Sequence, residues 1–485
     1  MPRWLTVAAF AAMLCAACLA GGAPERKAKP MLHVNGKPAL VLGLYENPTD
    51  DARLKEAVAA GFNLNQCAAK PEALDRVGAA GAKAWVNLGG GLDLSTETAV
   101  RRGRLEGTVN SLKAHPALLI WEAPDEALWN CSYGPLGTLE ETVYPAMHRA
   151  AEGRADFAPW KARIARTDDL LRRGLLDLAQ AEREAFWRAI GQSDPAPAVR
   201  PDLAVKAAKT MAAGMAAGVR AVRAADPKHP VWFNHAPRNA VGALKMFNTE
   251  ADAAGCDIYP IPFNMVNGHS DLVDTTPASV GAYTERMRIG APGKLCFMVL
   301  QGFGWIDITA EPEKVKDDRI GRRPTWQETR FMAYDALLHG ADALMWWGTA
   351  YAADKKEGGT KDLNTALWRD LLRIARELRA LEPLLVAPAA APGPKLTLEE
   401  NPSSHDGAGL VSTLRQAGGK TLLIVANERS TGRAFTVSGL PAALEGKPIY
   451  RLGTTETVTV RSGAFRDGVR GWDVHVYATS RDLEP

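Results

Sequence analysis

Short apolar stretches alternate with amphipathic ones eight times between Ala39 and about Leu385. The apolar stretches have the length and composition of strands buried on both faces, and the amphipathic stretches have the period of helices. Strands that alternate with helices run parallel. Eight such units predict an α/β fold, a (β/α)8 TIM barrel, whose chemistry is built at the C-terminal strand ends. The expected strands are 39–44, 62–67, 84–88, 118–122, 231–233, 255–259, 295–300 and 343–347.

The alternation is interrupted after the fourth strand, and the next strand begins only at Val231. Most of the gap has helical patterning, with one helix expected over 160–190 and an alanine-rich helix over 202–225. We therefore predict a helical insertion over 131–200, in the loop that follows strand four. Such loops lie on the active face of a barrel. Two interpretations stay open: a wall or lid for the site, or a surface bundle without a role there.

A second domain follows the barrel region, which spans 31–387. The linker 388–394 (PAAAPGP) leads into 395–485, where short runs alternate apolar and polar residues between Gly, Asn and Asp turns. This period-two pattern predicts a small antiparallel β-sandwich. Ahead of the barrel, Asn35-Gly36 predicts a hairpin turn within 31–38.

The first 23 residues have the form of a signal peptide, with Arg3, an apolar run over 4–20 and then small residues. The run is short for a membrane span. We expect an exported protein, periplasmic or at the cell surface. The passage Cys15-Ala16-Ala17-Cys18 resembles a bacterial lipobox and predicts a lipid anchor through Cys18, while soluble export after Ala20 or Ala23 is the alternative.

Composition excludes several classes of protein. The net charge is +3, from 58 basic and 55 acidic residues, and a dedicated nucleic-acid binder would carry a clustered basic excess. The four cysteines beyond the signal are widely spaced, unlike those of a disulfide scaffold, and Cys256 and Cys296 are expected to be small buried hydrophobes. Isolated histidines and the absence of cofactor motifs predict neither a metal site nor a cofactor.

The strongest candidate for an active centre is the stretch 120–129, I-W-E-A-P-D-E-A-L-W. It holds three carboxylates, Glu122, Asp125 and Glu126. Pro124 cannot donate to a sheet ladder, so strand four should end there and leave Asp125 and Glu126 on the catalytic face. Glu122 is expected to remain in the strand with a structural role. The alternative for the other two is helix capping or a salt bridge.

Four passages resemble the clan A superfamily of glycoside hydrolases, in an exported bacterial form with a C-terminal β-sandwich. They are the HPALLIW…DE passage (115–126), GCDIYP (255–260), VLQGF (299–303), and TWQE followed by HGA and WW (325–347). The resemblance covers Ala39 to the C-terminus and implies a carbohydrate substrate. Two positions depart from the clan pattern. Asp125 stands where the clan has Asn, and strand seven ends in Gln301 where the clan has its nucleophilic Glu.

A glycosidase of this kind needs a proton donor and a second group on the opposite face of the sugar. Glu126 is the expected donor, with a pKa raised by Asp125 and the tryptophans around it. The second group is expected to be Asp257 or Glu46. A carboxyl separation of roughly 6.5–9.5 Å would fit inversion, and roughly 5 Å would fit retention.

Further residues at strand ends have side chains suited to sugar binding, because aromatic rings stack on C–H surfaces and amides bind hydroxyls. Plain packing at the barrel top is the alternative for each. The expected substrate-binding residues are Glu46, Asn234, His235, Tyr259, Gln301, Trp346 and Trp347.

Two other functions stay open. In the first, Asp125-Glu126 acts with the acetamido group of the sugar, as in substrate-assisted hexosaminidases. In the second, the barrel has lost its nucleophile and only binds carbohydrate. Gln301 favours the second function, and the retained Asp125-Glu126 pair opposes it.

Overall fold

The structure is a computed structural model. It describes residues 31–485 apart from 47, 49, 97, 132–141, 155, 174, 238, 263–275, 310–317, 356–360 and 400–408. The predicted signal peptide (1–23) and Cys18 lie outside the described residues. No helix in the described ranges combines the length and apolar character needed to cross a membrane.

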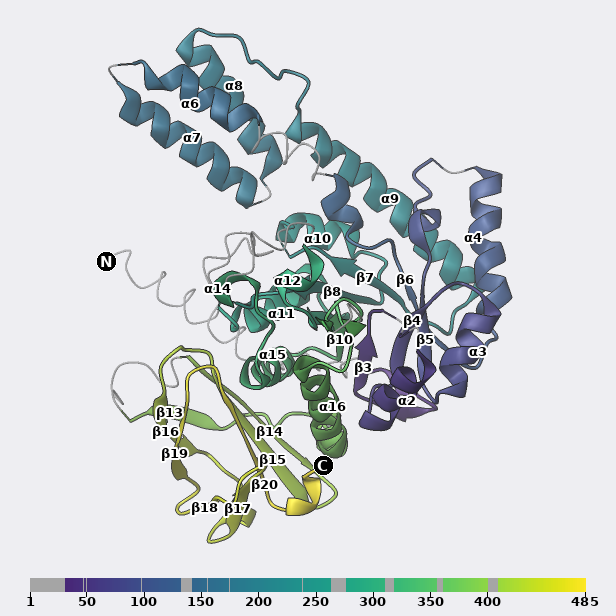
Figure 1. Ribbon diagram of the computed structural model, residues 1–485, viewed down its shortest axis with the longest axis vertical. Helices are drawn as coiled ribbons and strands as arrows, with labels where there is room; N and C mark the ends of the chain where they lie inside the picture. Colours follow the sequence, from purple (N-terminus) through teal and green to yellow (C-terminus); the bar gives the residue numbers. More distant parts are fainter. Residues whose placement is uncertain are drawn as a thin grey trace, which may run out of the picture. The chain divides into compact units, whose positions relative to one another are not determined.

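Eight parallel strands close into a barrel, which confirms the predicted α/β fold (Figure 1). Each strand pairs with the next in the chain, and β10 pairs with β3 to complete the ring. β6 ends at Glu122, just before Pro124, as predicted. The strands are β3 (Val41–Leu44), β4 (Leu64–Cys67), β5 (Lys83–Asn87), β6 (Leu118–Glu122), β7 (Val231–His235), β8 (Ala253–Ile258), β9 (Leu295–Gln301) and β10 (Ala343–Trp347).

Helices cover the outside of the barrel. Side-chain caps start several of them, and α15 has a capping box formed by Thr325 and Glu328, which satisfies donors at the first turn. The helices after the strands are α2 (Asp51–Ala60), α3 (Pro71–Ala79), α4 (Ala99–Leu112), α9 (Pro201–Ala225), α10 (Val241–Phe247), α11 (Ser279–Gly290), α15 (Trp326–Leu338) and α16 (Ala366–Leu385). Shorter elements are η1 (Gly89–Leu92), α12 (Trp305–Ile308), α14 (Asp318–Gly321) and the hairpin of β11 (Asp354–Lys355) and β12 (Lys361–Asp362).

The barrel interior is filled by large aromatic side chains. Trp85 contacts Trp232 edge to face at 5.8 Å between ring centroids, and Trp232 lies 5.7 Å from Phe297. Gly255 allows β8 and β9 to approach, because a Cβ there would stand 1.3 Å from the carbonyl oxygen of Phe297. At the N-terminal end, β1 (His33–Val34) and β2 (Lys37–Pro38) form the predicted hairpin, with Asn35 and Gly36 at positive φ.

The predicted insertion is helical, but its main helix is broken in two. The expected helix over 160–190 is instead α7 (Phe157–Arg172) and α8 (Leu176–Ile190), preceded by α6 (Tyr144–Glu152). The break lets α7 fold back on α8, so that both bury their apolar stripes in one core around Phe186. Figure 1 shows α6, α7 and α8 lying side by side. This core is separate from the clusters that hold the barrel.

The C-terminal region is the predicted antiparallel sandwich of two sheets. The small sheet holds β13 (Lys395–Leu398), β16 (Arg433–Ser438) and β19 (Phe465–Val469). The large sheet holds β14 (Leu410–Ala417), β15 (Lys420–Asn427), β20 (Val474–Ala478), β17 (Pro448–Arg451) and β18 (Thr457–Thr459), and the short helices are η3 (Ala442–Leu444) and η4 (Arg481–Leu483).

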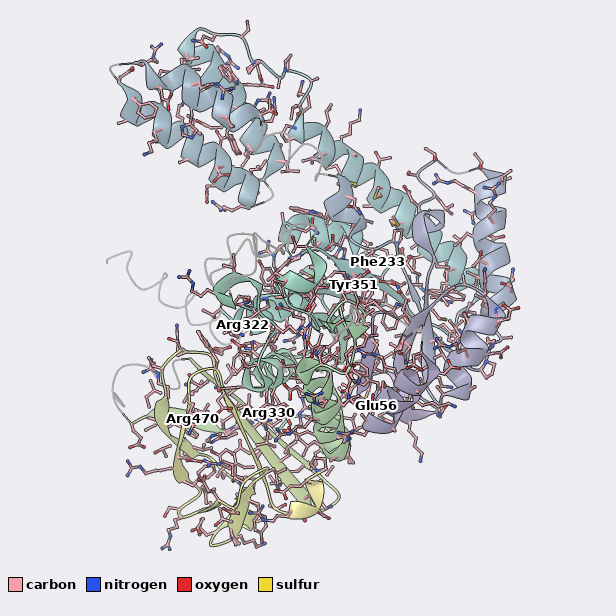
Figure 2. All side chains as sticks on the ribbon, viewed as in Figure 1. Glu56, Phe233, Arg322, Arg330, Tyr351 and Arg470 are labelled. Carbon is pink, nitrogen blue, oxygen red and sulfur yellow. The ribbon has the colours of Figure 1, made fainter. Side chains whose placement is uncertain are left out.

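The large sheet of the sandwich is buried on both faces at β15. Leu423 and Val425 face the small sheet, whereas Leu422 and Ile424 belong to the same cluster as the helices of the barrel. Arg330 of α15 crosses this junction and donates to Glu377 and to the carbonyl of Val474 (Figure 2). None of the four described cysteines takes part in a disulfide, and Cys256 and Cys296 are buried as expected.

Candidate active site

Three neighbouring elements bring carboxyl groups to the C-terminal mouth of the barrel. Glu122 ends β6, Asp125 and Glu126 lie in the turn that follows it, and Asp257 lies near the end of β8. Strands four and six of a TIM barrel contribute inward side chains to the same layer, so β6 and β8 place their acids together. Among the described residues, no salt bridge engages any of these four acids. Over the part of the mouth that the structure describes, these acids have no compensating cation in contact.

Glu126 and Asp257 form a hydrogen-bonded carboxyl pair. Burial raises the pKa of Asp257 well above its usual range, and the nearby charges of Glu126 and Asp125 raise it further. Burial also raises the pKa of Glu126, while the hydrogen bond from Asp257 works in the opposite direction. The two carboxyls therefore share their protons as a pair, in which Asp257 is buried and Glu126 is the more accessible partner.

The backbone at Glu126 is strained. Its φ is +47°, in the left-handed region that non-glycine residues rarely adopt. Such a conformation costs roughly 1–3 kcal/mol and persists only where surrounding contacts fix it. Here the Asn130 side chain donates to the carbonyl of Asp125 at 3.3 Å, and the amide of Asn130 donates to the carbonyl of Glu126 at 3.0 Å. The turn therefore holds the Glu126 carboxyl against Asp257.

Asp125 is exposed to solvent yet fixed by two donors. Its Oδ1 accepts from Asn234 Nδ2 at 2.8 Å and from the Tyr45 hydroxyl at 3.0 Å. Tyr45 also hydrogen-bonds to Oε1 of Glu122. The other oxygen of Glu122 accepts from Trp85 Nε1 at 3.0 Å and from Gln66 Nε2 at 3.2 Å. Burial, and then the charge of Asp125, raise the pKa of Glu122 to about 7.

Glu46 lies on the other side of the mouth, after β3. One of its oxygens accepts from the amide of Gly348, and the other hydrogen-bonds to Thr349 Oγ1 at 3.3 Å. Burial raises the pKa of Glu46 to about 7 against these contacts. Glu46 thus joins the loops that follow the first and last strands of the barrel.

Aromatic rings line the mouth near the end of β10. Tyr259 and Trp347 stack at 5.5 Å with an interplanar angle of 24°, and Phe303 contacts both edge to face. Tyr351 lies 5.7 Å from Trp347 and is half exposed (Figure 2). Trp347 and Tyr351 keep exposed ring surface, which suits the C–H surfaces of a sugar ring, whereas Tyr259 and Phe303 are buried behind them.

Gln301 stands at the end of strand seven (β9), and its side-chain amide is hydrogen-bonded to backbone groups. It accepts from the amide of Ile261 at 2.9 Å, and its Nε2 donates to the carbonyls of Ile261 at 2.7 Å and Phe303 at 3.0 Å. All three bonds hold the loops after β8 and β9 together. Gln301 is fully buried, so its side chain has no surface left for a ligand.

Two of the predicted site residues lie outside the mouth. Successive strand residues face opposite sides of a sheet. Asn234 faces the interior, so its neighbour His235 faces the helices, where its Nε2 contacts Asn248 Oδ1 at 2.9 Å. Burial lowers the pKa of His235 to about 4, so the ring is neutral. Trp346 likewise lies among the outer helices, 5.6 Å from Phe62.

The structure adds three residues that the sequence analysis did not single out. Tyr45, Gln66 and Trp85 converge on Glu122 from three different strands or strand ends. Their sequence signal is weak, because each is one polar or aromatic residue at the end of a short apolar strand. The barrel layer rule links strands two and four, and it would have pointed to Gln66.

A pocket of about 240 Å³ lies where the insertion joins the barrel. The loop that carries Glu126 supplies Leu128 and Trp129, α9 supplies Ala208, and the segment after β7 supplies Asn239 and Met246. The walls are mostly apolar. The insertion therefore packs beside the loop that holds Asp125 and Glu126 and beside the segment that follows β7.

The described residues contain a single group spaced to hold a metal ion, and it lies away from the mouth. Asp335, His339 and Glu428 approach one another where α15 meets the sandwich. His339 is already used in ion pairs, with Nε2 at 2.7 Å from Glu428 and Nδ1 at 2.8 Å from Glu285. The carboxylates of this group are therefore already paired with the positively charged ring of His339.

Comparison with known proteins gives a likeness in fold. No protein-family model matches the chain, and no curated protein matches it. Among solved structures, a catalytic mutant of Gan42B, a GH42 β-galactosidase from G. stearothermophilus, is 9% identical, with a TM-score of 0.51 over 90% of this chain and 98% of that one. A β-galactosidase from Rahnella sp. R3 is 11% identical, with a TM-score of 0.49 over 93% of this chain and 100% of that one. This protein and the Gan42B mutant are thus alike in fold.

Proposed function

We propose that the protein is a glycoside hydrolase acting on a poly- or oligosaccharide, with Glu126 as its general acid. The observation that carries this proposal is the hydrogen-bonded pair of Glu126 and Asp257 in the barrel mouth. Glycosidic cleavage needs a carboxylic acid that keeps its proton near neutral pH until the leaving oxygen takes it. Burial of Glu126 beside Asp125 supplies that condition.

Asp257 supports proton transfer without touching the sugar oxygen. When Glu126 gives up its proton it becomes a carboxylate, and a hydrogen bond to a charged acceptor is stronger than one to a neutral acceptor. The Asp257 hydroxyl donates that bond. Glu126 can then recover a proton from water in the second half of the reaction.

The second group of a two-carboxylate mechanism is difficult to assign among the described residues. Hydrogen-bonded carboxyls are closer than the roughly 5 Å of retaining enzymes or the 6.5–9.5 Å of inverting ones, so Asp257 does not suit attack from the opposite face. Gln301 has no carboxylate and no free amide. Glu46 is bound to the loop at Gly348.

These observations favour a substrate-assisted N-acetylhexosaminidase as the second candidate. In that mechanism the acetamido oxygen of the sugar attacks its own C1, and a carboxylate beside the acid holds the acetamido N–H. Asp125 is exposed, adjacent to Glu126, and fixed by Tyr45 and Asn234. A rigid acceptor of this kind suits the orientation of an amide.

The test is a hydrolysis screen with aryl glycosides that carry or lack a 2-acetamido group, followed by an oligosaccharide library. Wild type is assayed beside Glu126→Gln and Asp125→Asn. Loss of a general acid lowers kcat by about 10²–10⁴-fold. If only acetamido sugars are cleaved, and Asp125→Asn loses that activity, the substrate-assisted form holds.

A different result would support a binding protein. If neither wild type nor Glu126→Gln releases sugar, while both retain glycan binding, the hydrolase proposal fails and a carbohydrate-binding barrel remains. Release of sugar by both proteins alike would remove Glu126 from the acid role.

We also propose that the chain is exported and anchored through Cys18. The support is the form of residues 1–23. Labelled fatty acid incorporated into wild type and not into Cys18→Ser would bear this out. Release of an unlabelled protein of the mature length would favour soluble export instead.

A further inference from the structure

Tyr45 has one phenolic proton and two carboxyl neighbours. Its hydroxyl lies within hydrogen-bond distance of Glu122 Oε1 and of Asp125 Oδ1. A tyrosine hydroxyl donates one hydrogen bond and can also accept. If both carboxyls were ionised, one of the two contacts would bring oxygen lone pairs together without a hydrogen. One of the two acids must therefore carry a proton of its own.

The surroundings decide which acid carries that proton. Glu122 is fully buried at the end of β6, and among the described residues no lysine, arginine or histidine pairs with it. The groups that face it are the neutral Gln66 and Trp85, the hydroxyl of Tyr45 and the acid Asp125. Asp125 is exposed and has Asn234 as a second donor. A charge is therefore far less costly on Asp125 than on Glu122.

We propose that Glu122 is a neutral carboxylic acid in the folded protein and that it donates to Tyr45, which donates in turn to Asp125. This hydrogen-bonded chain makes Glu122 and Tyr45 positioning residues and ends at Asp125, the solvent-exposed acceptor of the mouth. The polar atoms of Glu122 and the Tyr45 hydroxyl are then matched. Oε2 of Glu122 accepts from Trp85 and Gln66, Oε1 carries the proton, and Asp125 accepts from Tyr45 and Asn234.

The consequence for chemistry rests on the proposed function. Asp125 keeps its charge while its neighbour Glu126 holds a proton, so two adjacent acids have opposite protonation states. A fixed carboxylate can accept an acetamido N–H or stabilise the positive charge that develops on the sugar ring. Ionisation of Glu122 would draw the Tyr45 proton inward and remove one donor from Asp125.

The direct test is a neutron structure of the perdeuterated wild-type protein at a pD near 6, below the titration of Glu122. The expected result is a deuterium on Glu122 Oε1 and the Tyr45 deuteron directed at Asp125. A bare Glu122 with the Tyr45 deuteron directed at it would overturn the proposal. The measurement needs no substrate, so a failed hydrolysis screen leaves it intact, and it can fail while the enzyme is active.

A variant provides the second test. Glu122→Gln keeps a neutral donor and acceptor of the same shape, so it should fold. The free energy of unfolding of wild type should fall as the pH rises from about 4.5 to 7, because Glu122 ionises in the unfolded chain before it does so in the folded one. The variant should lose this fall. Glu46→Gln is the control, at a partly buried glutamate that lies outside this hydrogen-bonded chain and also has a raised pKa. Glu46→Gln should lose the part of the pH dependence of stability that Glu46 contributes and should keep the part that Glu122 contributes. An unchanged pH dependence in Glu122→Gln would contradict a buried neutral acid, and so would a variant less stable than wild type at pH 8.

Discussion

At the residue scale, the mouth shows how burial sorts chemically identical groups. Glu122 and Asp257 have no solvent to stabilise a charge, whereas Asp125 is exposed and has two donors. Glu126 lies between these extremes, buried in part and bonded to Asp257. The order of protonation therefore follows from position on two strands and one turn, and not from residue type.

Asp257 offers the first prediction. Asp257→Ala removes the donor that stabilises the Glu126 carboxylate, so the pKa of Glu126 should rise by about one to two units, which corresponds to a hydrogen bond to a charged group of roughly 1.5–3 kcal/mol. Asp257→Asn keeps an N–H donor and should leave the pKa of Glu126 close to that of wild type. Carboxyl carbon NMR titration of labelled glutamate measures both, with Glu126→Gln to identify the resonance. Equal titration in wild type and Asp257→Ala would mean that the pair is not coupled.

The sequence analysis predicts Asp125, Glu126 and Asp257 as site residues, but it does not predict which side chains contact them. β7, β8 and β10 are apolar on both faces, so period-two alternation cannot tell an inward residue from an outward one. For that reason His235 and Trp346 were grouped with Asn234 and Trp347, although they face the helices. Tyr45 was overlooked because its role depends on barrel closure, which brings the first and fourth strands to one point.

At the element scale, the alternation of strands and helices was sufficient to predict the barrel. Strand length, helix period and the Thr325 cap all lie within a few residues of one another in the chain, so local sequence carries them. The break between α7 and α8 was missed because both sides continue the same helical pattern. Only the shared core around Phe186 explains the fold-back.

The pocket beside α9 leads to the second prediction. Ala208 lines it, and Ala208→Met would fill part of the 240 Å³ with methylene and sulfur atoms. Cavity-filling changes commonly stabilise a protein by about 0.5–2 kcal/mol. Ala207→Met on the exposed side of the same helix is the control and should stay within about 0.5 kcal/mol of wild type. Urea unfolding measures both. Destabilisation by Ala208→Met alone would mean that the pocket cannot accept added volume.

The separate core of the insertion leads to the third prediction. Phe186 is fully buried in it, and Phe186→Ala should cost about 3–5 kcal/mol. Because this cluster does not merge with the barrel clusters, the loss should appear as faster hydrogen exchange in α7 and α8, with the barrel strands still protected. Faster exchange throughout the barrel would show that the two cores unfold together.

At the scale of the whole molecule, barrel and sandwich are joined by charge as well as by apolar contact. His339, the residue that follows α15, lies between Glu428 of the sandwich at 2.7 Å and Glu285 of α11 at 2.8 Å, with Asp335 at 3.7 Å. Burial by itself would lower the pKa of His339, but Glu428, Asp335 and Glu285 outweigh it and raise the pKa to about 9. His339 is therefore an imidazolium at neutral pH.

This raised pKa gives the fourth prediction. A base with a folded pKa near 9 and an unfolded value near 6.5 contributes stability that is fully present below pH 6.5 and is lost as pH rises through 9. The difference amounts to about 3 kcal/mol. His339→Gln should remove that contribution, so the gap in unfolding free energy between wild type and variant should close from pH 6 to pH 10. A gap that stays constant with pH would assign the variant's effect to packing.

The two-sided burial of β15 has a consequence for how this protein can be taken apart. A domain that is joined to its neighbour only through a linker can be moved to another protein as a module. Here, in contrast, one face of the sandwich packs against the helices that surround the barrel. A chain cut at the linker 388–394 would leave Leu422, Ile424 and their partners on α15 and α16 facing water. The sandwich and the barrel therefore form one unit for protein engineering, and chimaeras of this fold should exchange both or neither.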